Sequence, residues 1–251
     1  MTRSFVASIF IVGLLTTAAM PAAAAVTSPA IAAAVVDTGR PDKERALDAG
    51  RKPAELLSFI HLKSGQKVVD IFPGAYWDRM FSKVVGAKGS VTMWQSVEMA
   101  KAEEEKLPAD GSHPLAGYTN VTAMSGPINA FSTPRPVDVV WMRQNYHDLY
   151  DKFMGPADVP AFNLAVFKAL KHGGVYVIID HSAPDGSGLA ATDTTHRIDS
   201  AVVKKDMATA GFVFAGESNV LRNPADARDK LVFDKTIRGK TDQFVYLFRK
   251  P

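Results

Sequence analysis

The chain has 251 residues, contains no cysteine and carries a formal net charge of +3. Disulfide bridges and thiolate metal sites are therefore excluded, and an apolar core must stabilise the fold. Lys and Arg are spread along the chain and do not cluster with aromatic residues, so no nucleic-acid partner is expected. The length fits one domain with a substantial core.

The first 25 residues have the features of an export signal. Arg3 provides a positive start, residues 4–19 are apolar or small, and residues 22–25 offer an Ala-x-Ala cleavage site. The apolar run is shorter than the roughly 20 residues that a membrane span needs. We therefore expect a cleaved signal over residues 1–25 and no stable membrane span afterwards. The mature protein is expected to be exported, either to the periplasm or into the medium.

The segment after the signal is Ala-rich and has no clear periodicity, so residues 26–42 are predicted to be a flexible lead-in. A single α/β domain is expected over residues 43–251, because no linker divides it. Its first elements are a short charged helix within residues 43–50 and a second helix that begins at Pro53, where a missing N–H costs nothing.

From residue 67 onward, strand and helix patterns alternate. Helices are predicted over residues 77–85, 96–107, 159–170 and 193–210. Strands are predicted over residues 67–72, 90–94, 120–124, 138–142, 175–180, 212–215 and 244–248. This alternation indicates βαβ units and a doubly wound α/β fold with a mostly parallel, seven-stranded sheet.

Polar residues follow several of these strands. Ligands of open α/β sheets bind outside the carboxyl ends of the strands, so these residues are the first candidates for a site. We expect that one cavity is lined by Gly74, Asn145, Tyr146, His147, His181 and His196. Alternatively, residues 145–148 form a rigid polar turn, because Asn and Asp favour turns.

Several segments together resemble a known family. They are residues 50–55, 145–148, 170–174, 180–181, 196–199, 239–244 and 248–251. The chain resembles the class I S-adenosylmethionine (SAM) dependent methyltransferases, which have a Rossmann-like fold. More narrowly, it is similar to a group of exported bacterial methyltransferase-like proteins.

The resemblance implies SAM as the cofactor. Asp70 matches the acidic residue of the first strand, and Gly74 matches the middle glycine of the loop that follows. Phe72 and Tyr76 stand where family members have two further glycines, and Gln95 follows the second strand where an acid binds the ribose. The implied cofactor-binding residues are Asp70, Gly74, Tyr76, Trp77, Gln95 and Asn145.

Methyl transfer mainly needs two reactants held in line, which positioning can supply. His147 or His181 is a candidate base for the acceptor, because an imidazole titrates near neutral pH. Asp148 is a candidate to orient that histidine, and Tyr146 and Trp77 are candidates to stack on adenine or on the acceptor. The sequence thus predicts a SAM-dependent methyltransferase with a small-molecule substrate and a weakened cofactor site.

Two alternatives remain. The altered glycine loop suits a non-catalytic or repurposed ligand-binding protein on the same fold, since a fold does not fix a function. A metal site built from His147, His181 and His196 with Asp148 is also compatible with the ligands that zinc, copper or iron prefer. The sequence lacks a tight metal-ligand spacing such as H-E-x-x-H, so no metal is expected. It indicates no oligomeric state.

Overall fold

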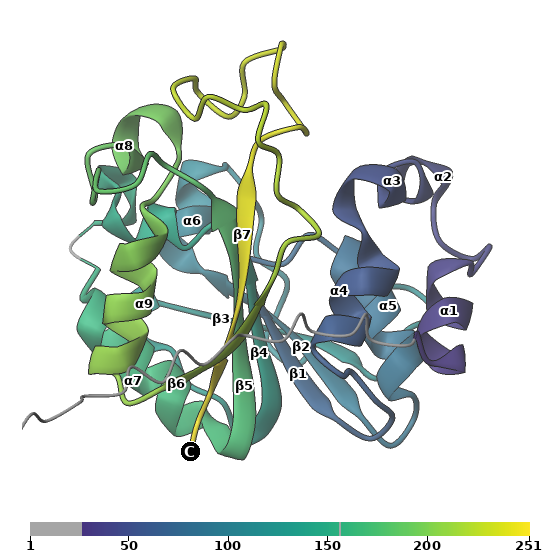
Figure 1. Cartoon of the computed structure of the whole chain (residues 1–251). Helices are drawn as coiled ribbons and strands as arrows, with labels where there is room; N and C mark the ends of the chain where they lie inside the picture. The colour runs from purple at the N-terminus through teal and green to yellow at the C-terminus, as the bar shows by residue number, and fades with distance from the viewer. Residues whose placement is uncertain (1–26, 156) are drawn as a thin grey trace, which may run out of the picture.

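The computed structural model describes residues 27–155 and 157–251. The predicted export signal lies outside these residues. The described part of the chain folds into a seven-stranded sheet between two layers of helices (Figure 1). This confirms the predicted α/β fold with a doubly wound, mostly parallel sheet.

The strand order in the sheet is β3-β2-β1-β4-β5-β7-β6. Strands β1 to β5 run parallel, whereas β7 is antiparallel to both β5 and β6. The chain leaves β1 in one direction towards β3 and returns to add β4 on the other side, so the strand order reverses at β1 and β4. The strands are β1 (Lys67–Ile71), β2 (Ser90–Ser96), β3 (Val121–Gly126), β4 (Val137–Arg143), β5 (Leu170–His181), β6 (Val213–Ser218) and β7 (Gln243–Arg249).

Each face of the sheet is covered by its own set of helices and has its own apolar core. Figure 1 shows α4 and α5 on one side and α7 and α9 on the other. The helices are α1 (Pro29–Val35), α2 (Asp42–Arg45), α3 (Asp48–Arg51), α4 (Pro53–Phe59), α5 (Tyr76–Val85), α6 (Val97–Ala102), α7 (Val159–Ala169), α8 (Thr192–Thr195) and α9 (Ser200–Thr209). Three short 3₁₀ helices are η1 (Ile128–Ala130), η2 (His147–Tyr150) and η3 (Lys152–Met154).

Residues 29–35 form α1, where the sequence analysis predicts part of a flexible lead-in. The side chain of Ser28 caps this helix by accepting a hydrogen bond from the Ile31 N–H at 3.3 Å. Ile31 and Ala34 are buried in the core beneath α4 and α5. Alanine is also the best helix former, so the Ala-rich composition that gave no periodicity favours a helix once one face is buried.

The predicted helix over residues 193–210 is broken. His196 has φ of +53°, in the left-handed region, and it separates α8 from α9. Asp199 then caps α9 by accepting a hydrogen bond from the Ala201 N–H at 2.9 Å. This break turns His196 out of the helical register and lets it face the end of the sheet.

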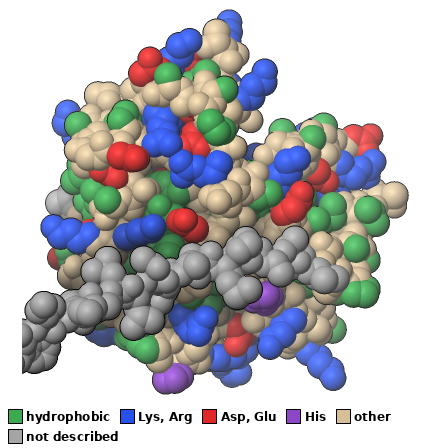
Figure 2. Space-filling view, viewed as in Figure 1, with side chains coloured by type: hydrophobic (Ala, Val, Ile, Leu, Met, Phe, Trp, Pro, Cys, Tyr) green, Lys and Arg blue, Asp and Glu red, His purple; other side chains and the backbone are tan. Residues whose placement is uncertain are grey.

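The surface carries charges of both signs. Figure 2 shows Lys and Arg side chains interspersed with Asp and Glu over one face of the molecule. None of the helices within the described residues has the length and apolarity that crossing a bilayer would require.

Candidate functional site

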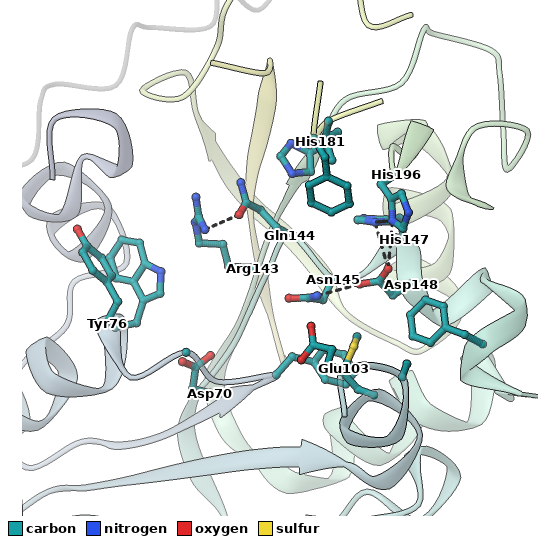
Figure 3. A pocket seen from close by; sticks show the side chains of 18 of the residues that line it. Asp70, Tyr76, Glu103, Arg143, Gln144, Asn145, His147, Asp148, His181 and His196 are labelled. Atoms are coloured by element: carbon teal, nitrogen blue, oxygen red, sulfur yellow. Dashed lines mark hydrogen bonds and ion pairs between the residues drawn. The ribbon is translucent and has the colours of Figure 1, made fainter. Parts of the chain in front are cut away.

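A cleft of about 610 Å³ opens at the carboxyl edge of the sheet, beside β1 and β4. Its volume lies in the range of sites for small organic ligands. It sits where the strand order reverses, which is where open α/β sheets bind ligands. Figure 3 shows Tyr76 and Asp70 at one end and His147, Asp148 and His196 at the other, with Arg143 between them.

The structure brings most of the predicted site residues together. The cleft is lined by Asp70, Gly74, Tyr76, Trp77, Asn145, His147, Asp148, His181 and His196. These residues come from β1 with the loop and the start of α5 that follow it, from the segment after β4, from the end of β5 and from the break before α9. The expected convergence at one edge therefore holds for all of the proposed rim except Tyr146.

Tyr146 lies in the core. Its side chain is fully buried, and its hydroxyl donates to Asp206 at 3.0 Å and accepts from the Asn163 amide at 2.8 Å. It therefore connects the loop after β4 to α7 and α9. The predicted stacking of Tyr146 on adenine or acceptor is wrong, because the ring does not face the cleft.

Gln95 also does not line the cleft. Its amide nitrogen donates to Glu105 at 2.8 Å, and its amide oxygen accepts from the Ser96 N–H at 3.1 Å. Both polar atoms are thus used within the β2–α6 region, which corrects its predicted role at a ribose. The acidic residue that does line the cleft from this region is Glu103, which follows α6.

The loop after β1 forms a tight turn without glycine at two of its positions. Phe72 and Ala75 have φ of +59° and +62°, a region that non-glycine residues seldom adopt. Phe72 also packs against the core beneath α7 and α9. At Gly74, an added Cβ would meet no atom within 4 Å, so the backbone faces open space there. Phe72 and Ala75 thus adopt the positive φ angles that glycine would take most readily.

Two carboxyl groups are buried at this end of the cleft. Burial, and then the neighbouring Asp78 carboxyl, raises the pKa of Asp70 well above its usual value. Burial raises the pKa of Asp78 to about 7. Arg143 lies close by, and burial followed by the nearby Arg51 lowers its pKa to about 9. This end of the cleft therefore holds two carboxyl groups that resist ionisation, beside the guanidinium groups of Arg51 and Arg143.

His147 lies at the other end of the cleft and is fixed by carboxylates. Its backbone N–H donates to Asp180 Oδ2 at 2.8 Å, and its ring Nδ1 lies 2.9 Å from Asp180 Oδ1. Its Nε2 is 3.2 Å from Asp148 Oδ1. Burial would lower the pKa of His147, but Asp180 and Asp148 outweigh burial and raise it to about 10.

His181 has the opposite electrostatic setting. Burial, and then the charge of His147, holds the pKa of His181 well below its usual value. Its Nδ1 lies 2.7 Å from the Thr241 hydroxyl. Its other ring nitrogen, Nε2, is therefore the one available to a ligand in the cleft that His181 lines. Of the two histidines proposed as bases, His181 is therefore neutral near pH 7 and His147 is charged.

Several cleft residues are not predicted from the sequence. Arg51, Glu103, Phe153, Val232 and Phe233 line it, and Asp151 and Asp180 lie behind it. Arg51 and Phe233 lie far in the sequence from any predicted strand end, so their positions in the chain do not indicate that they line the cleft. Asp180 is the last residue of a predicted strand and directly precedes His181, so its position at the strand end does indicate that it lies near the cleft.

No protein-family model matches the chain, and no curated protein matches its sequence. Solved structures do match. A SAM-dependent methyltransferase from Aquifex aeolicus aligns at 18% identity and a TM-score of 0.51, over 84% of this chain and 99% of that one. The chain has the class I methyltransferase fold.

Two further structures with this fold extend the comparison. An S-adenosylmethionine-dependent methyltransferase from Mesorhizobium loti aligns at 15% identity and a TM-score of 0.50, over 81% of this chain and 99% of that one. The [4+2]-cyclase SpnF aligns at 12% identity and a TM-score of 0.50, over 86% of this chain and 85% of that one. A methyltransferase-like fold thus occurs with more than one activity, and the residues of the site must carry the functional argument.

Proposed function

We propose that the protein is a SAM-dependent methyltransferase that acts on a small-molecule acceptor. The observation that carries this proposal is the cleft at the carboxyl edge of β1 and β4, with Asp70 and Gly74 at one end and His181 on its wall. The fold, shared with SAM-dependent methyltransferases, supports the same reading.

The residues at the β1 end of the cleft fit SAM. Gly74 leaves open space for close approach of a ligand to the backbone. Asp70 lines the cleft, and its carboxyl would accept hydrogen bonds from the amino group of the ligand. Asp70 and the loop around Gly74 would hold the methionine part, and Glu103 would accept hydrogen bonds from the ribose hydroxyls. When bound, SAM supplies a methyl group attached to a positively charged sulfur.

The chain's own residues then orient the acceptor and accept its proton. His181 is neutral, and in the tautomer whose Nδ1–H donates to the Thr241 hydroxyl oxygen its Nε2 has the free lone pair that takes a proton from the acceptor. Phe153 and Phe233 line the opening of the cleft and provide apolar contact area for the acceptor.

Export remains part of this proposal. If residues 1–25 are removed as a signal, the mature protein begins near Val26 and acts outside the cytoplasm. N-terminal sequencing of protein recovered from the cell envelope or medium tests this directly. Recovery of an intact Met1 in a soluble cytoplasmic form contradicts export without affecting the proposed chemistry.

The decisive experiment is calorimetry of the purified protein with SAM and with S-adenosylhomocysteine. We expect both to bind, and Asp70→Asn to weaken binding at least tenfold. Asp229→Asn is the matched control, because Asp229 is exposed and lies outside the cleft. Failure of the wild-type protein to bind either compound would overturn the proposed function.

A further inference from the structure

Four side chains at the histidine end of the cleft bring their donor atoms together. His147, Asp148, Asp151 and His196 each offer one ligand atom, and all four atoms lie within 4.8 Å of one another. We propose that these four side chains bind a divalent transition-metal ion of the zinc type. The proposal goes beyond methyl transfer, because it concerns a bound ion that the transfer reaction does not require.

The spacing of the donor atoms fits a tetrahedral ion. Zinc bonds of about 2.0–2.2 Å place the ligand atoms of a tetrahedron roughly 3.3–3.6 Å apart. His147 Nε2 lies 3.2 Å from His196 Nδ1 and 3.2 Å from Asp148 Oδ1. His196 Nδ1 lies 3.7 Å from Asp148 Oδ1 and 3.9 Å from Asp151 Oδ2. Small shifts of the side chains would complete the geometry.

The partner of His147 supports the same assignment. A carboxylate accepts hydrogen bonds, so Asp180 Oδ1 accepts the proton of His147 Nδ1 across 2.9 Å. On binding the ion, His147 Nε2 would give up its proton and direct its lone pair at the ion, beside the other three donor atoms. Metal-binding histidines commonly donate their second ring N–H to a carboxylate, which orients the ring and makes it a better ligand.

Asp151 provides independent evidence. Its side chain is 1% exposed, and among the described residues neither carboxylate oxygen has a hydrogen-bond partner. The hydroxyl of nearby Thr192 donates instead to the Leu189 carbonyl at 3.3 Å. Buried polar groups in proteins are nearly always paired, so this carboxylate needs a partner. A cation held between Asp151 and the two histidines supplies it.

The local backbone explains how the ligands meet. Asp148 lies in the 3₁₀ helix η2, and Asp151 is the residue that ends it, with its backbone N–H donating to the Asp148 carbonyl at 3.0 Å. His196 comes from the left-handed break between α8 and α9. The sequence therefore shows no compact metal motif, because two separate turns supply the ligands.

The donor set selects the kind of ion. Two imidazoles and two carboxylates suit zinc and related transition metals, whereas magnesium prefers oxygen ligands alone. His181 does not belong to the set, because its Nδ1 contacts Thr241 and its ring centre lies 6.3 Å from that of His147. The sequence suggests three histidines with Asp148 as a possible metal site. The proposed ligand set differs from it by including Asp151 in place of His181.

The test uses the full, purified chain stripped with a chelator and then dialysed against zinc sulfate or magnesium chloride. Elemental analysis should find one zinc per chain, and zinc but not magnesium should raise the melting temperature. Asp151→Asn keeps the shape of the side chain but removes its charge. We expect this variant to lose both the bound zinc and the zinc-induced shift, without a lower melting temperature in the metal-free form.

His172→Asn is the control, because His172 is exposed on the first part of β5 and lies outside the cluster. It should bind zinc as the wild-type protein does. If Asp151→Asn fails to fold, His196→Asn replaces a partly exposed ligand and should lose zinc in the same way. The absence of stoichiometric zinc in the wild type, or unchanged binding in the folded variants, overturns the proposal. SAM calorimetry is read separately, so the two proposals can fail independently.

Discussion

The carboxylate of Asp180 binds His147 through both the backbone N–H, at 2.8 Å, and the ring Nδ1, at 2.9 Å. Asp180 Oδ1 also accepts the His181 N–H at 2.7 Å. One fully buried carboxylate at the end of β5 therefore fixes the loop after β4 and the backbone that carries His181. The positions of His147 and His181, two of the three cleft histidines, depend on this residue.

Asp180→Asn should lower the free energy of unfolding by roughly 2–4 kcal/mol. The amide replaces one acceptor oxygen by a donor, so at least one N–H of His147 or His181 is left without a partner in the interior. Urea unfolding measures this loss. Asp193→Asn, on the exposed side of α8, should change the free energy by less than about 0.5 kcal/mol. Equal stabilities for the two variants would show that Asp180 does not fix the loop.

Asp78→Asn should stabilise the protein at neutral pH and make no difference in acid. Burial raises the pKa of Asp78 from 3.8 to about 7, so the folded state binds more protons than the unfolded state between these values. The contribution of Asp78 to the stability of the wild type therefore falls as pH rises from about 4 to 7 and is constant above. The amide avoids this penalty, which we expect to be roughly 2–4 kcal/mol at pH 8.

Thermal or urea unfolding at pH 4, 6 and 8 tests this expectation. Asp229→Asn, at an exposed position, should follow the wild-type curve at each pH. A variant Asp78→Asn that is less stable than the wild type at pH 8 would mean that the ionised carboxylate is well solvated or paired in the folded protein.

The alternation of apolar runs was sufficient to predict the sheet and the edge at which the cleft forms. Strand ends are a good guide, because parallel strands bring distant loops such as those at Gly74, His147 and His181 to one place. The position of a residue at a strand end does not, however, predict whether its side chain points into the cleft. Tyr146 and Gln95 lie at the correct edge, but their partners Asp206 and Glu105 hold them away from the cleft.

Other features arise from contacts that the local pattern does not contain. The helix of residues 29–35 depends on burial of Ile31 against α4 and α5. The left-handed His196 interrupts a sequence with good helical spacing, and the next residue, Arg197, is held by Asp226 at 2.9 Å. Asp151 becomes a candidate ligand only because it ends η2 within reach of His147, Asp148 and His196.

Phe233→Ala should weaken acceptor binding without affecting stability. Phe233 is 54% exposed, lines the cleft, and has its ring centre 5.2 Å from that of His196. A large exposed aromatic at the opening of a site is more readily explained by ligand contact than by folding. We expect KM for the acceptor to rise about tenfold, as loss of roughly 1.4 kcal/mol of contact would give. Leu231→Ala, in the same segment but outside the cleft lining, should leave KM unchanged.

His181→Gln should lower kcat for methyl transfer by about 10²–10⁴-fold, the range that a positioned general base contributes. The affinity for S-adenosylhomocysteine should stay within threefold of the wild type, because the β1 end of the cleft is unchanged. The measurement is release of S-adenosylhomocysteine with an acceptor found by screening, together with calorimetry. Thr241→Ala removes the partner of Nδ1 but leaves the imidazole in place, so its kcat should fall less than that of His181→Gln.

Because the pKa of His181 lies well below its usual value, kcat of the wild type should show no loss near pH 6.5 from protonation of this group. If His181→Gln retains kcat within threefold while Thr241→Ala loses stability, His181 is a structural residue and another group takes the proton.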